Sequence, residues 1–266
     1  MCGMVGYVGV QSALDAVLEG LGRLSGPPAA QGTGPTAGKQ ANTAADAGGS
    51  GSSGVAVLAD GGLAAAGAHG GLPELREALR GRPLPAGACA VGSLAAAAGT
   101  PAARGGPEPL PGLDPSGRVA VVHEGELDNR GELRAELTAR GHVLLSQTDA
   151  EVVAHLLAES FSSCVELGEA MRQVCRTLRG SFSLLAVHAD QPDAVVGACR
   201  GASLAVGVGE QESYLASDPA AFGDQATREV LRLGGEAEVV VLRRDHPDGD
   251  EVRCEVTDLD GGVVRA

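Results

Sequence analysis

The chain opens with Met1-Cys2-Gly3-Met4-Val5-Gly6-Tyr7, in which a cysteine follows the initiator methionine and leads into a glycine-punctuated apolar strand. Removal of Met1 would give Cys2 both a thiol and a free α-amine. An α-amine has an unperturbed pKa near ~8, so part of it is unprotonated at neutral pH and can accept the thiol proton. This is the chemistry of an N-terminal nucleophile, whose base is the chain terminus itself. A role for Cys2 as a small buried apolar residue explains the same seven residues equally well.

Composition limits the classes of function that the chain can serve. Its 266 residues suffice for one large domain or two small ones, and 44% of them are hydrophobic, so a sizeable core is possible. A formal net charge of −14 argues against nucleic acids and anionic membranes as partners. No apolar run reaches the ~18 residues of a membrane span, and no basic segment leads into an apolar one at the N-terminus. We therefore expect no signal peptide and a cytoplasmic location.

The six cysteines are widely scattered and form no Cys-x-x-Cys pair. This spacing fits neither a zinc site nor a disulfide framework, so we expect reduced thiols, no metal and no cofactor. They are Cys2, Cys89, Cys164, Cys175, Cys199 and Cys254.

The first half of the chain alternates regular elements with two segments that lack core residues. Apolar spacing predicts strands at 4–10 and 54–58, helices at 12–24 and 72–79, and a hairpin turn at Asp60-Gly61-Gly62. Residues 26–53 are almost entirely small or polar and cannot bury enough surface to offset their ordering entropy, which predicts a disordered insertion. Residues 99–117 contain five prolines and form a second irregular segment.

The second half predicts three helices set between runs of strands. Capping boxes at Asn129–Glu132 and Thr148–Glu151 open the first two helices, and a third runs through Leu167 to Leu178. Strands are predicted at 119–123, 181–188, 194–199, 203–208, 213–216, 237–243 and 252–257. Helices clustered between hairpin-linked strands indicate an α+β fold with antiparallel sheets covered by helices.

In this order, these segments resemble the glutaminase domain of class II glutamine amidotransferases, and in particular the N-terminal half of glucosamine-6-phosphate synthases (glutamine–fructose-6-phosphate aminotransferases). The resemblance covers most of the chain outside the two irregular segments. It is carried by residues 2–7, 18–24, 121–125, 133–137, 146–156, 178–182, 198–203 and 214–218.

The resemblance implies a four-layer αββα sandwich with two antiparallel sheets face to face. It also implies that Cys2 attacks the side-chain amide of L-glutamine, that a thioester forms and ammonia leaves, and that water then releases glutamate. The sugar isomerase half of that family is missing from these residues. We therefore read 1–266 as a single domain, whose ammonia acceptor would be a separate synthetase or isomerase subunit.

The predicted oxyanion site departs from the family pattern, which is His-Asn-Gly where this chain has His123-Glu124-Gly125. The Gly125 N–H remains as a donor, but an ionised Glu124 only accepts hydrogen bonds. Losing one oxyanion donor costs roughly 3–4 kcal/mol of transition-state stabilisation. A protonated Glu124 would instead donate, and a Glu124 that points into solvent would do neither.

The groups that would bind the rest of glutamine are only partly retained. No arginine stands in Gly92–Pro101, where the family has the one that binds the substrate carboxylate; Ser93 is the polar residue left there, and Arg104 lies nearby in sequence. Asp149 matches the aspartate that receives the substrate α-amine, and it would also stabilise a helix N-terminus. We expect His155 to be structural and His123 to hydrogen-bond locally.

Three hypotheses follow from these residues. The first is glutaminase-type amide hydrolysis through Cys2, with Gly125 as the remaining oxyanion donor, Asp149 as the amine anchor and a degraded glutamine pocket. The second is an inactive pseudo-glutaminase that serves as a regulatory or partner subunit. The third is an amidase for a different small amide without a free carboxylate, in which case the missing arginine is a change of specificity.

Overall fold

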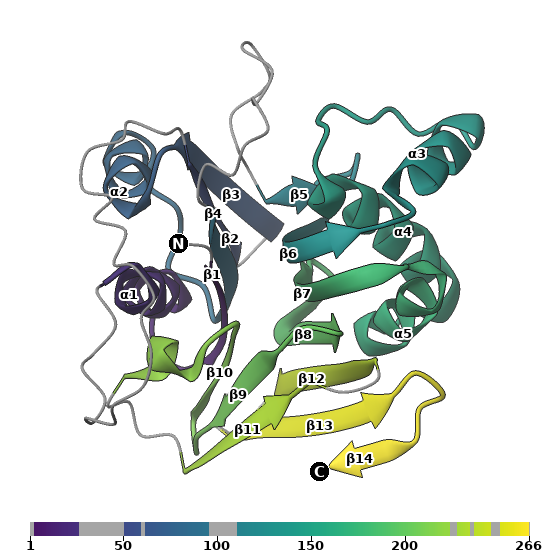
Figure 1. The fold of residues 1–266 in the computed structure, drawn as a ribbon. Helices are drawn as coiled ribbons and strands as arrows, with labels where there is room; N and C mark the ends of the chain where they lie inside the picture. Colours follow the sequence, from purple (N-terminus) through teal and green to yellow (C-terminus); the bar gives the residue numbers. More distant parts are fainter. Residues whose placement is uncertain are drawn as a thin grey trace, which may run out of the picture.

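A computed structural model describes residues 3–26, 51–59, 62–95, 111–223, 228–234, 237–245 and 251–265. These residues form four layers, with two antiparallel sheets face to face and helices on both outer sides (Figure 1). The predicted α+β fold of the αββα type is thereby confirmed. The assignment of 1–266 to a single domain stays a prediction.

The first sheet, called the β1 sheet, has seven strands in the order β11-β9-β10-β1-β4-β2-β3. The N-terminal strand lies at its centre, between β10 and β4. Its members are β1 (Gly3–Gly9), β2 (Ser52–Ala59), β3 (Gly62–His69), β4 (Cys89–Ala95), β9 (Leu204–Val208), β10 (Glu212–Ala216) and β11 (Glu229–Leu233).

The second sheet, called the β6 sheet, also has seven strands, in the order β14-β13-β12-β8-β7-β6-β5. Its longest ladder joins β6 and β7, from Val119 opposite His188 to Leu127 opposite Gly180. Its members are β5 (Gly112–Leu113), β6 (Val119–Leu127), β7 (Gly180–His188), β8 (Gln191–Arg200), β12 (Glu238–Arg244), β13 (Val252–Asp258) and β14 (Val263–Arg265).

Helices cover the outer face of each sheet. On the β1 sheet these are α1 (Ala13–Ser25) and α2 (Leu72–Gly81), followed later in the chain by the short 3-10 turn η1 (Pro219–Phe222). On the β6 sheet, α4 (Asp149–Cys164) and α5 (Leu167–Thr177) pack directly on the strands, and α3 (Arg130–Ala139) packs against α4. Figure 1 shows α1 and α2 on one side of the two sheets and α3, α4 and α5 on the other.

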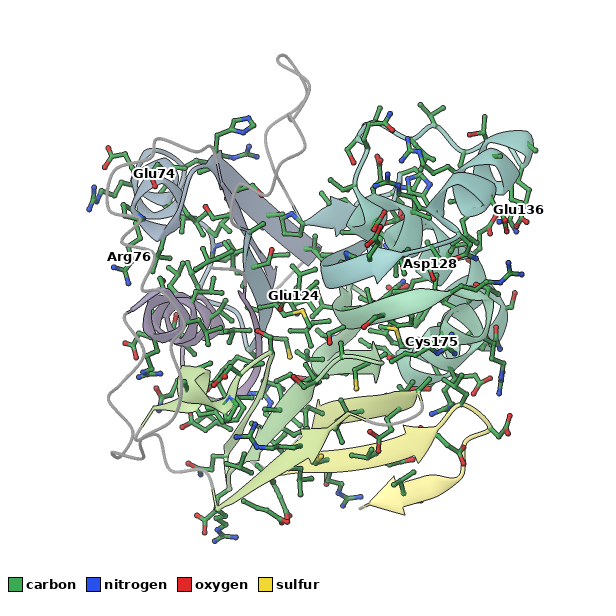
Figure 2. The ribbon with its side chains drawn as sticks, viewed as in Figure 1. Glu74, Arg76, Glu124, Asp128, Glu136 and Cys175 are labelled. Atoms are coloured by element: carbon green, nitrogen blue, oxygen red, sulfur yellow. The ribbon has the colours of Figure 1, made fainter. Side chains whose placement is uncertain are left out.

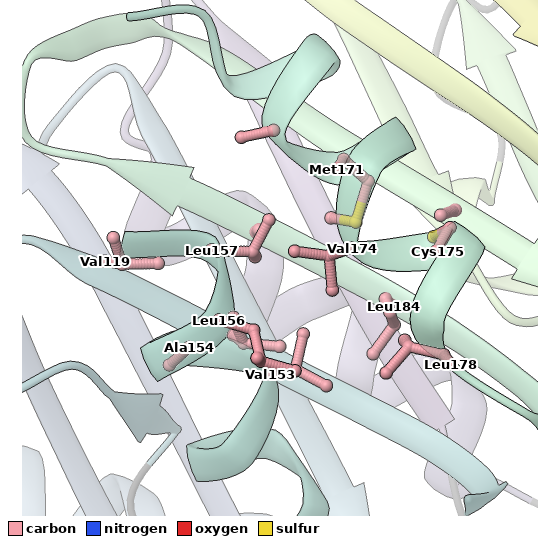
Figure 3. Close-up of a cluster of buried hydrophobic side chains, with 14 of the residues drawn as sticks. Val119, Val153, Ala154, Leu156, Leu157, Met171, Val174, Cys175, Leu178 and Leu184 are labelled. Atoms are coloured by element: carbon pink, nitrogen blue, oxygen red, sulfur yellow. The ribbon is translucent and has the colours of Figure 1, made fainter. Parts of the chain in front are cut away.

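Strand alternation assigns each apolar residue to one of the three core layers, because successive side chains point to opposite faces of a sheet. In β6, Ala120 and Val122 face the β1 sheet, whereas Val119 and Val121 face α4. Figure 3 shows this outer layer, in which Val119 lies with side chains of α4 and α5. In β1, Met4 faces the β6 sheet. The side chains of odd-numbered and even-numbered residues of β6 therefore pack in different core layers.

The structure corrects several predicted boundaries. Of the predicted insertion at 26–53, residues 27–50 lie outside the described residues, whereas Ser52 and Ser53 already belong to β2. Of the irregular segment at 99–117, residues 99–110 also lie outside, and Gly112–Leu113 form β5. Asp60 and Gly61 of the predicted hairpin turn lie outside as well, although β2 and β3 do pair as a hairpin. The strands β3, β4, β11 and β14 were not predicted either.

The two predicted capping boxes have different outcomes. Thr148 does cap α4, since its hydroxyl oxygen accepts the Glu151 N–H at 3.3 Å. Asn129 occupies the N-cap position of α3, but its side chain makes no cap hydrogen bond. It instead donates to the Thr177 carbonyl at 2.9 Å and accepts the Arg179 N–H at 3.0 Å. The prediction for Asn129 was wrong because tertiary partners near β7 compete for its amide.

The turn that precedes β6 is held by hydrogen bonds to a buried carboxylate. Asp114 is only 6% exposed, and its oxygens accept the N–H groups of Ser116, Arg118 and Val119 at 3.0, 2.7 and 2.7 Å. Its carboxylate also accepts the Ser116 hydroxyl. Burial alone would raise the pKa of Asp114, but these hydrogen bonds hold that pKa below its ordinary value. The start of β6 is thus fixed by a fully partnered carboxylate.

Candidate functional site

The predicted nucleophile, Cys2, lies outside the described residues. Its chain neighbour Gly3 is the first residue of β1 and is paired with Leu94 of β4. The candidate site is therefore built from the elements that surround the start of β1.

The start of β1 and the end of β6 lie at the same end of the sandwich. In the β1–β4 pair, Gly3 lies near one end and Cys89 near the other. In the β6 sheet, Gly125 likewise lies near one end, and Asp193 and Arg244 lie near the other. The charges of Asp193 and Arg244 act on the Cys89 thiol, so these two ends meet. Gly3 and Gly125 consequently share the other end.

The backbone at Gly125 requires glycine. Its φ is +109°, and a Cβ at this position would lie 2.3 Å from the Ser181 carbonyl oxygen, closer than any side chain tolerates. The residue is exposed, so a ligand can reach this stretch of backbone. The sequence prediction placed an oxyanion donor here, and the structure gives Gly125 a backbone conformation that side-chain-bearing residues rarely adopt.

Glu124 lies between the two sheets rather than in solvent (Figure 2). It follows Ala120 and Val122 on the inner face of β6, and it is half-buried. Its Oε2 atom is buried and accepts no hydrogen bond from any residue that the structure describes. The expectation that Glu124 points into solvent was therefore wrong. A buried polar atom left without a partner costs about 1–3 kcal/mol, and a charged one costs more.

His123 occupies the opposite face of β6, in line with Val119 and Val121, which face α4. Burial lowers the pKa of His123, and the Asp149 carboxylate of α4 partly opposes this shift. Its Nε2 atom is buried and has no hydrogen-bond partner within the described ranges. The predicted local hydrogen bond is therefore not found at this atom. The imidazole and the Asp149 carboxylate instead interact through space.

Asp149 is the first residue of α4, as both of its predicted roles require. Its side chain is 11% exposed, and its Oδ1 atom lies 3.3 Å from Nη1 of Arg130, the first residue of α3. The loop before α4 is held by Glu151, whose carboxylate accepts the N–H groups of Leu145 and Ser146 at 2.6 and 2.8 Å. This network fixes the position from which Asp149 projects.

Ser93 contributes the polar side chain of the facing sheet. It lies on β4 opposite Met4 of β1 and opposite Gly54 of β2, and it is half-buried. The structure thus brings Ser93, Glu124 and Gly125 to one end of the sandwich, whereas Asp149 approaches β6 from its outer side. Arg104 lies outside the described residues.

Arg130 is a charged neighbour of Asp149 that sequence reasoning did not single out. A signal was present, because a basic residue in the first turn of a helix opposes the helix dipole and so calls for another explanation. His155, by contrast, is structural as expected: it is 1% exposed, and its Nδ1 lies 2.8 Å from Nδ1 of His142.

Four of the other cysteines are poor nucleophiles. Burial raises the pKa of Cys175 and of Cys199 to about 12 and that of Cys254 to about 11, and it raises the pKa of Cys89 as well. Within the described residues, no three His, Cys, Asp or Glu side chains gather closely enough to hold a metal ion. No helix in that part of the chain is long and apolar enough to cross a bilayer.

Comparison with known sequences identifies relatives over nearly the whole chain. A family model described as a glutamine amidotransferase domain matches residues 99–223. The glutamine–fructose-6-phosphate aminotransferase (isomerizing) of Streptomyces coelicolor is 52% identical over 248 residues, which cover 92% of this chain and 36% of that protein. The enzyme of the same name from Thermus thermophilus is 36% identical and matches 100% of this chain and 38% of its own length. The chain thus spans little more than a third of these curated relatives.

Solved structures support the same fold. Glutamine phosphoribosylpyrophosphate amidotransferase from B. subtilis superposes with a TM-score of 0.68 at 19% identity, covering 100% of this chain and 50% of its own. A glutamine aminotransferase class-II domain protein from Silicibacter pomeroyi superposes with a TM-score of 0.51 at 12% identity, covering 97% of this chain and 99% of its own. At these identities the likeness concerns the fold.

Proposed function

Because this chain belongs to the class II glutamine amidotransferase family, we propose that it hydrolyses a side-chain carboxamide with Cys2 as the nucleophile. L-Glutamine is the proposed substrate, and glutamate and ammonia are the products. The proposal keeps the first of the three hypotheses drawn from the sequence and treats the pseudo-glutaminase as its rival.

The proposed reaction uses groups that the chain itself carries. After Met1 is removed, the Cys2 α-amine accepts the thiol proton, and the thiolate attacks the amide carbon. The Gly125 N–H donates to the oxygen that becomes negatively charged, and this stabilises the tetrahedral intermediate. The amide nitrogen takes a proton and leaves as ammonia, which leaves a thioester on Cys2. Water then attacks the thioester by the same route, releases glutamate and restores the thiol.

The observation that carries the proposal is the conformation of Gly125. Its positive φ and the 2.3 Å approach of the Ser181 carbonyl to a would-be Cβ restrict the position to glycine. This exposed backbone lies at the end of the sandwich nearest Gly3, which supports a role for Gly125 beside Cys2.

A second function, that of an inactive partner subunit, is favoured by Glu124. Its buried and unpartnered Oε2 atom stands where the family has an amide donor. An ionised carboxylate there would repel the developing oxyanion by about as much as one lost donor costs, since two charges ~4 Å apart interact by about 4 kcal/mol at an effective dielectric near 20. Slow hydrolysis is therefore expected even if the proposal is right.

Two measurements separate these functions. Mass spectrometry of the intact chain shows whether Met1 is removed, which the proposal requires. Glutamate release from L-glutamine is then followed for the unmodified chain, for Cys2→Ala and for Cys164→Ala, a matched control on α4. We expect release that Cys2→Ala abolishes and Cys164→Ala leaves unchanged. Retention of Met1, or release that is equal in all three proteins, would establish the inactive function instead.

The ammonia acceptor is a separate proposal, because the matched residues cover only 36% and 38% of the two relatives. We propose that the acceptor is bound by a synthetase or isomerase subunit, and the names of the relatives make fructose 6-phosphate the first acceptor to test. Amino-sugar formation on mixing the chain with an isolated sugar isomerase domain would support this assignment, whereas release of free ammonia alone would argue against it.

A further inference from the structure

Arg130 projects its guanidinium beside the proposed amine anchor. Its Nη1 atom lies 3.3 Å from Oδ1 of Asp149, and its side chain is 52% exposed while that of Asp149 is 11% exposed. A guanidinium carries five N–H donors, and Asp149 is the one partner of the Arg130 guanidinium among the described residues. Most of its donors are therefore free to bind a second anion.

The stability of the fold does not account for this placement. Arg130 is the first residue of α3, where the partial positive charge of the helix terminus opposes a cation. The ion pair with Asp149 joins two helices, but one partner is largely in solvent, and exposed pairs of this kind contribute little to stability. The position therefore calls for a role in binding.

The neighbouring arginines are already committed to other partners. Arg134 donates from Nη2 to the Ser146 carbonyl at 2.8 Å, while its buried Nη1 lies 4.0 Å from Glu151 and has no hydrogen-bond partner among the described residues. Arg200 donates to the Leu178 and Cys175 carbonyls. Arg179 lies 3.6 Å from Glu132 on the outer surface of α3. Among these arginines of the described ranges, Arg130 is thus the one that pairs with Asp149 and also exposes much of its side chain to a ligand.

We propose that Arg130 binds the α-carboxylate of the substrate while Asp149 receives its α-ammonium. This assignment rests on the proposed function, since it takes Asp149 as the amine anchor. The ammonium and carboxylate of an α-amino acid are separated by a single carbon, so they match two adjacent side chains of opposite charge. Binding exchanges one ion pair within the protein for two between protein and ligand. Arg130 thereby supplies, from α3, the carboxylate-binding arginine that the Gly92–Pro101 segment lacks.

The inference fixes the substrate class as an L-α-amino acid with a side-chain amide, rather than an amide without a carboxylate. It is tested by calorimetric binding in a Cys2→Ala background, where no turnover is needed. The ligands are L-glutamine and 4-aminobutanamide, which keeps the amine and the amide but lacks the carboxylate. The variants are Arg130→Gln, Arg130→Lys and the control Arg179→Gln, an exposed arginine paired to the same helix.

We expect Arg130→Gln to weaken L-glutamine binding roughly 10- to 100-fold, the range for loss of a charged hydrogen-bond partner. Binding of 4-aminobutanamide should not change, Arg130→Lys should recover part of the loss, and Arg179→Gln should have no effect. Equal weakening of both ligands by Arg130→Gln, no weakening, or no L-glutamine binding at millimolar concentration would overturn the assignment. If the expected pattern appears without turnover by the unmodified chain, the proposed hydrolysis fails while the role of Arg130 stands.

Discussion

The turn that precedes β6 and the later part of β6 each hold an acidic side chain, which is buried at Asp114 and half-buried at Glu124, and the hydrogen bonding of the two carboxylates differs. At the first end, the Asp114 carboxylate accepts three backbone N–H groups and a hydroxyl. At the second end, the buried Glu124 Oε2 atom accepts no hydrogen bond from the described residues, and the buried Nε2 atom of His123, on the opposite face of the strand, has no partner there either.

The two carboxylates differ in how they affect the stability of the fold. A buried polar atom must be hydrogen-bonded for the fold to benefit from it, and Asp114 meets that requirement. Atoms that stay unpartnered lower stability, and they are concentrated at sites where a ligand or a reacting group supplies the missing bond. The Asp114 end therefore stabilises the fold, whereas the unpartnered atoms at the Glu124 end lower the stability of the fold.

The largest effect is expected from Glu124→Asn, which puts an amide donor next to Gly125. Restoring one oxyanion donor should raise the rate of glutamate release by about 10²- to 10³-fold, or roughly 3–4 kcal/mol of transition-state stabilisation. Steady-state kinetics with L-glutamine measures this change. Glu126→Asn, on the exposed part of the same strand, is the control. A variant no faster than the unmodified chain would mean that Glu124 is not what limits the reaction.

At the other end, Asp114→Ala should lower the free energy of unfolding by about 3 kcal/mol. The substitution leaves three backbone N–H groups at the start of β6 without their acceptor, and hydrogen bonds to a charged group are the strong ones. Chemical denaturation followed by circular dichroism gives the value. Asp260→Ala, at a side chain that is 95% exposed, is the reference. If Asp114→Ala lowers the free energy of unfolding no more than Asp260→Ala does, the Asp114 carboxylate does not stabilise the start of β6 as proposed.

Acid should weaken the Asp114 end through His188, which is paired with Val119 at the start of β6. Burial, with a smaller contribution from Arg118, lowers the pKa of His188 to about 4. The unfolded chain, with a histidine pKa near ~6.5, binds a proton first as pH falls. Stability is therefore complete above about pH 6.5 and declines toward pH 4, by roughly 2 kcal/mol.

Unfolding free energies at pH 7.0 and 4.5 test this dependence, with His188→Asn as the comparison. Asparagine keeps an acceptor for the Asp190 N–H, which His188 Nδ1 now accepts at 2.9 Å, but it does not titrate. The difference between the two pH values should shrink in this variant. An unchanged difference would assign the acid sensitivity to other groups.

The smallest effect is a gain in stability from Glu124→Met. Replacing the unpartnered carboxylate with an apolar side chain of similar length should raise the free energy of unfolding by about 1 kcal/mol, because no donor is abandoned in exchange. Thermal unfolding measures this gain in stability, and Glu126→Met is the control. A loss of stability would show that Glu124 has a donor in the folded chain, and the two ends of β6 would then be alike.

The sequence predicted most of the fold because the core elements are strongly periodic. Helices such as α5 and strands such as β7 carry their apolar residues at the spacing of their own secondary structure. The strand β3 was missed because Gly62–His69 is mostly alanine and glycine, which carry almost no strand signal. Its hairpin partner β2, rather than its own composition, makes it a strand.

The candidate site was predictable only where it follows a local motif. Gly125 and Asp149 were predicted from the short motifs that carry the family resemblance, and their roles stay predictions; the structure gives Gly125 a positive φ and makes Asp149 the first residue of α4. Arg130 and the burial of Glu124 depend on how α3 meets α4 and how the two sheets face each other. The spacing of residues along the chain does not reveal such contacts, so the position of Arg130 and the burial of Glu124 could be seen only in the structure.

The burial of four thiols has a practical consequence for labelling. Thiol reagents attack the thiolate, and Cys89, Cys175, Cys199 and Cys254 stay protonated at neutral pH because burial raises their pKa values. Alkylation by iodoacetamide is then confined to Cys2 and Cys164. A Cys164→Ser chain becomes a single-site reporter, in which a mass increment or an attached fluorophore follows the chemistry of the first residue alone.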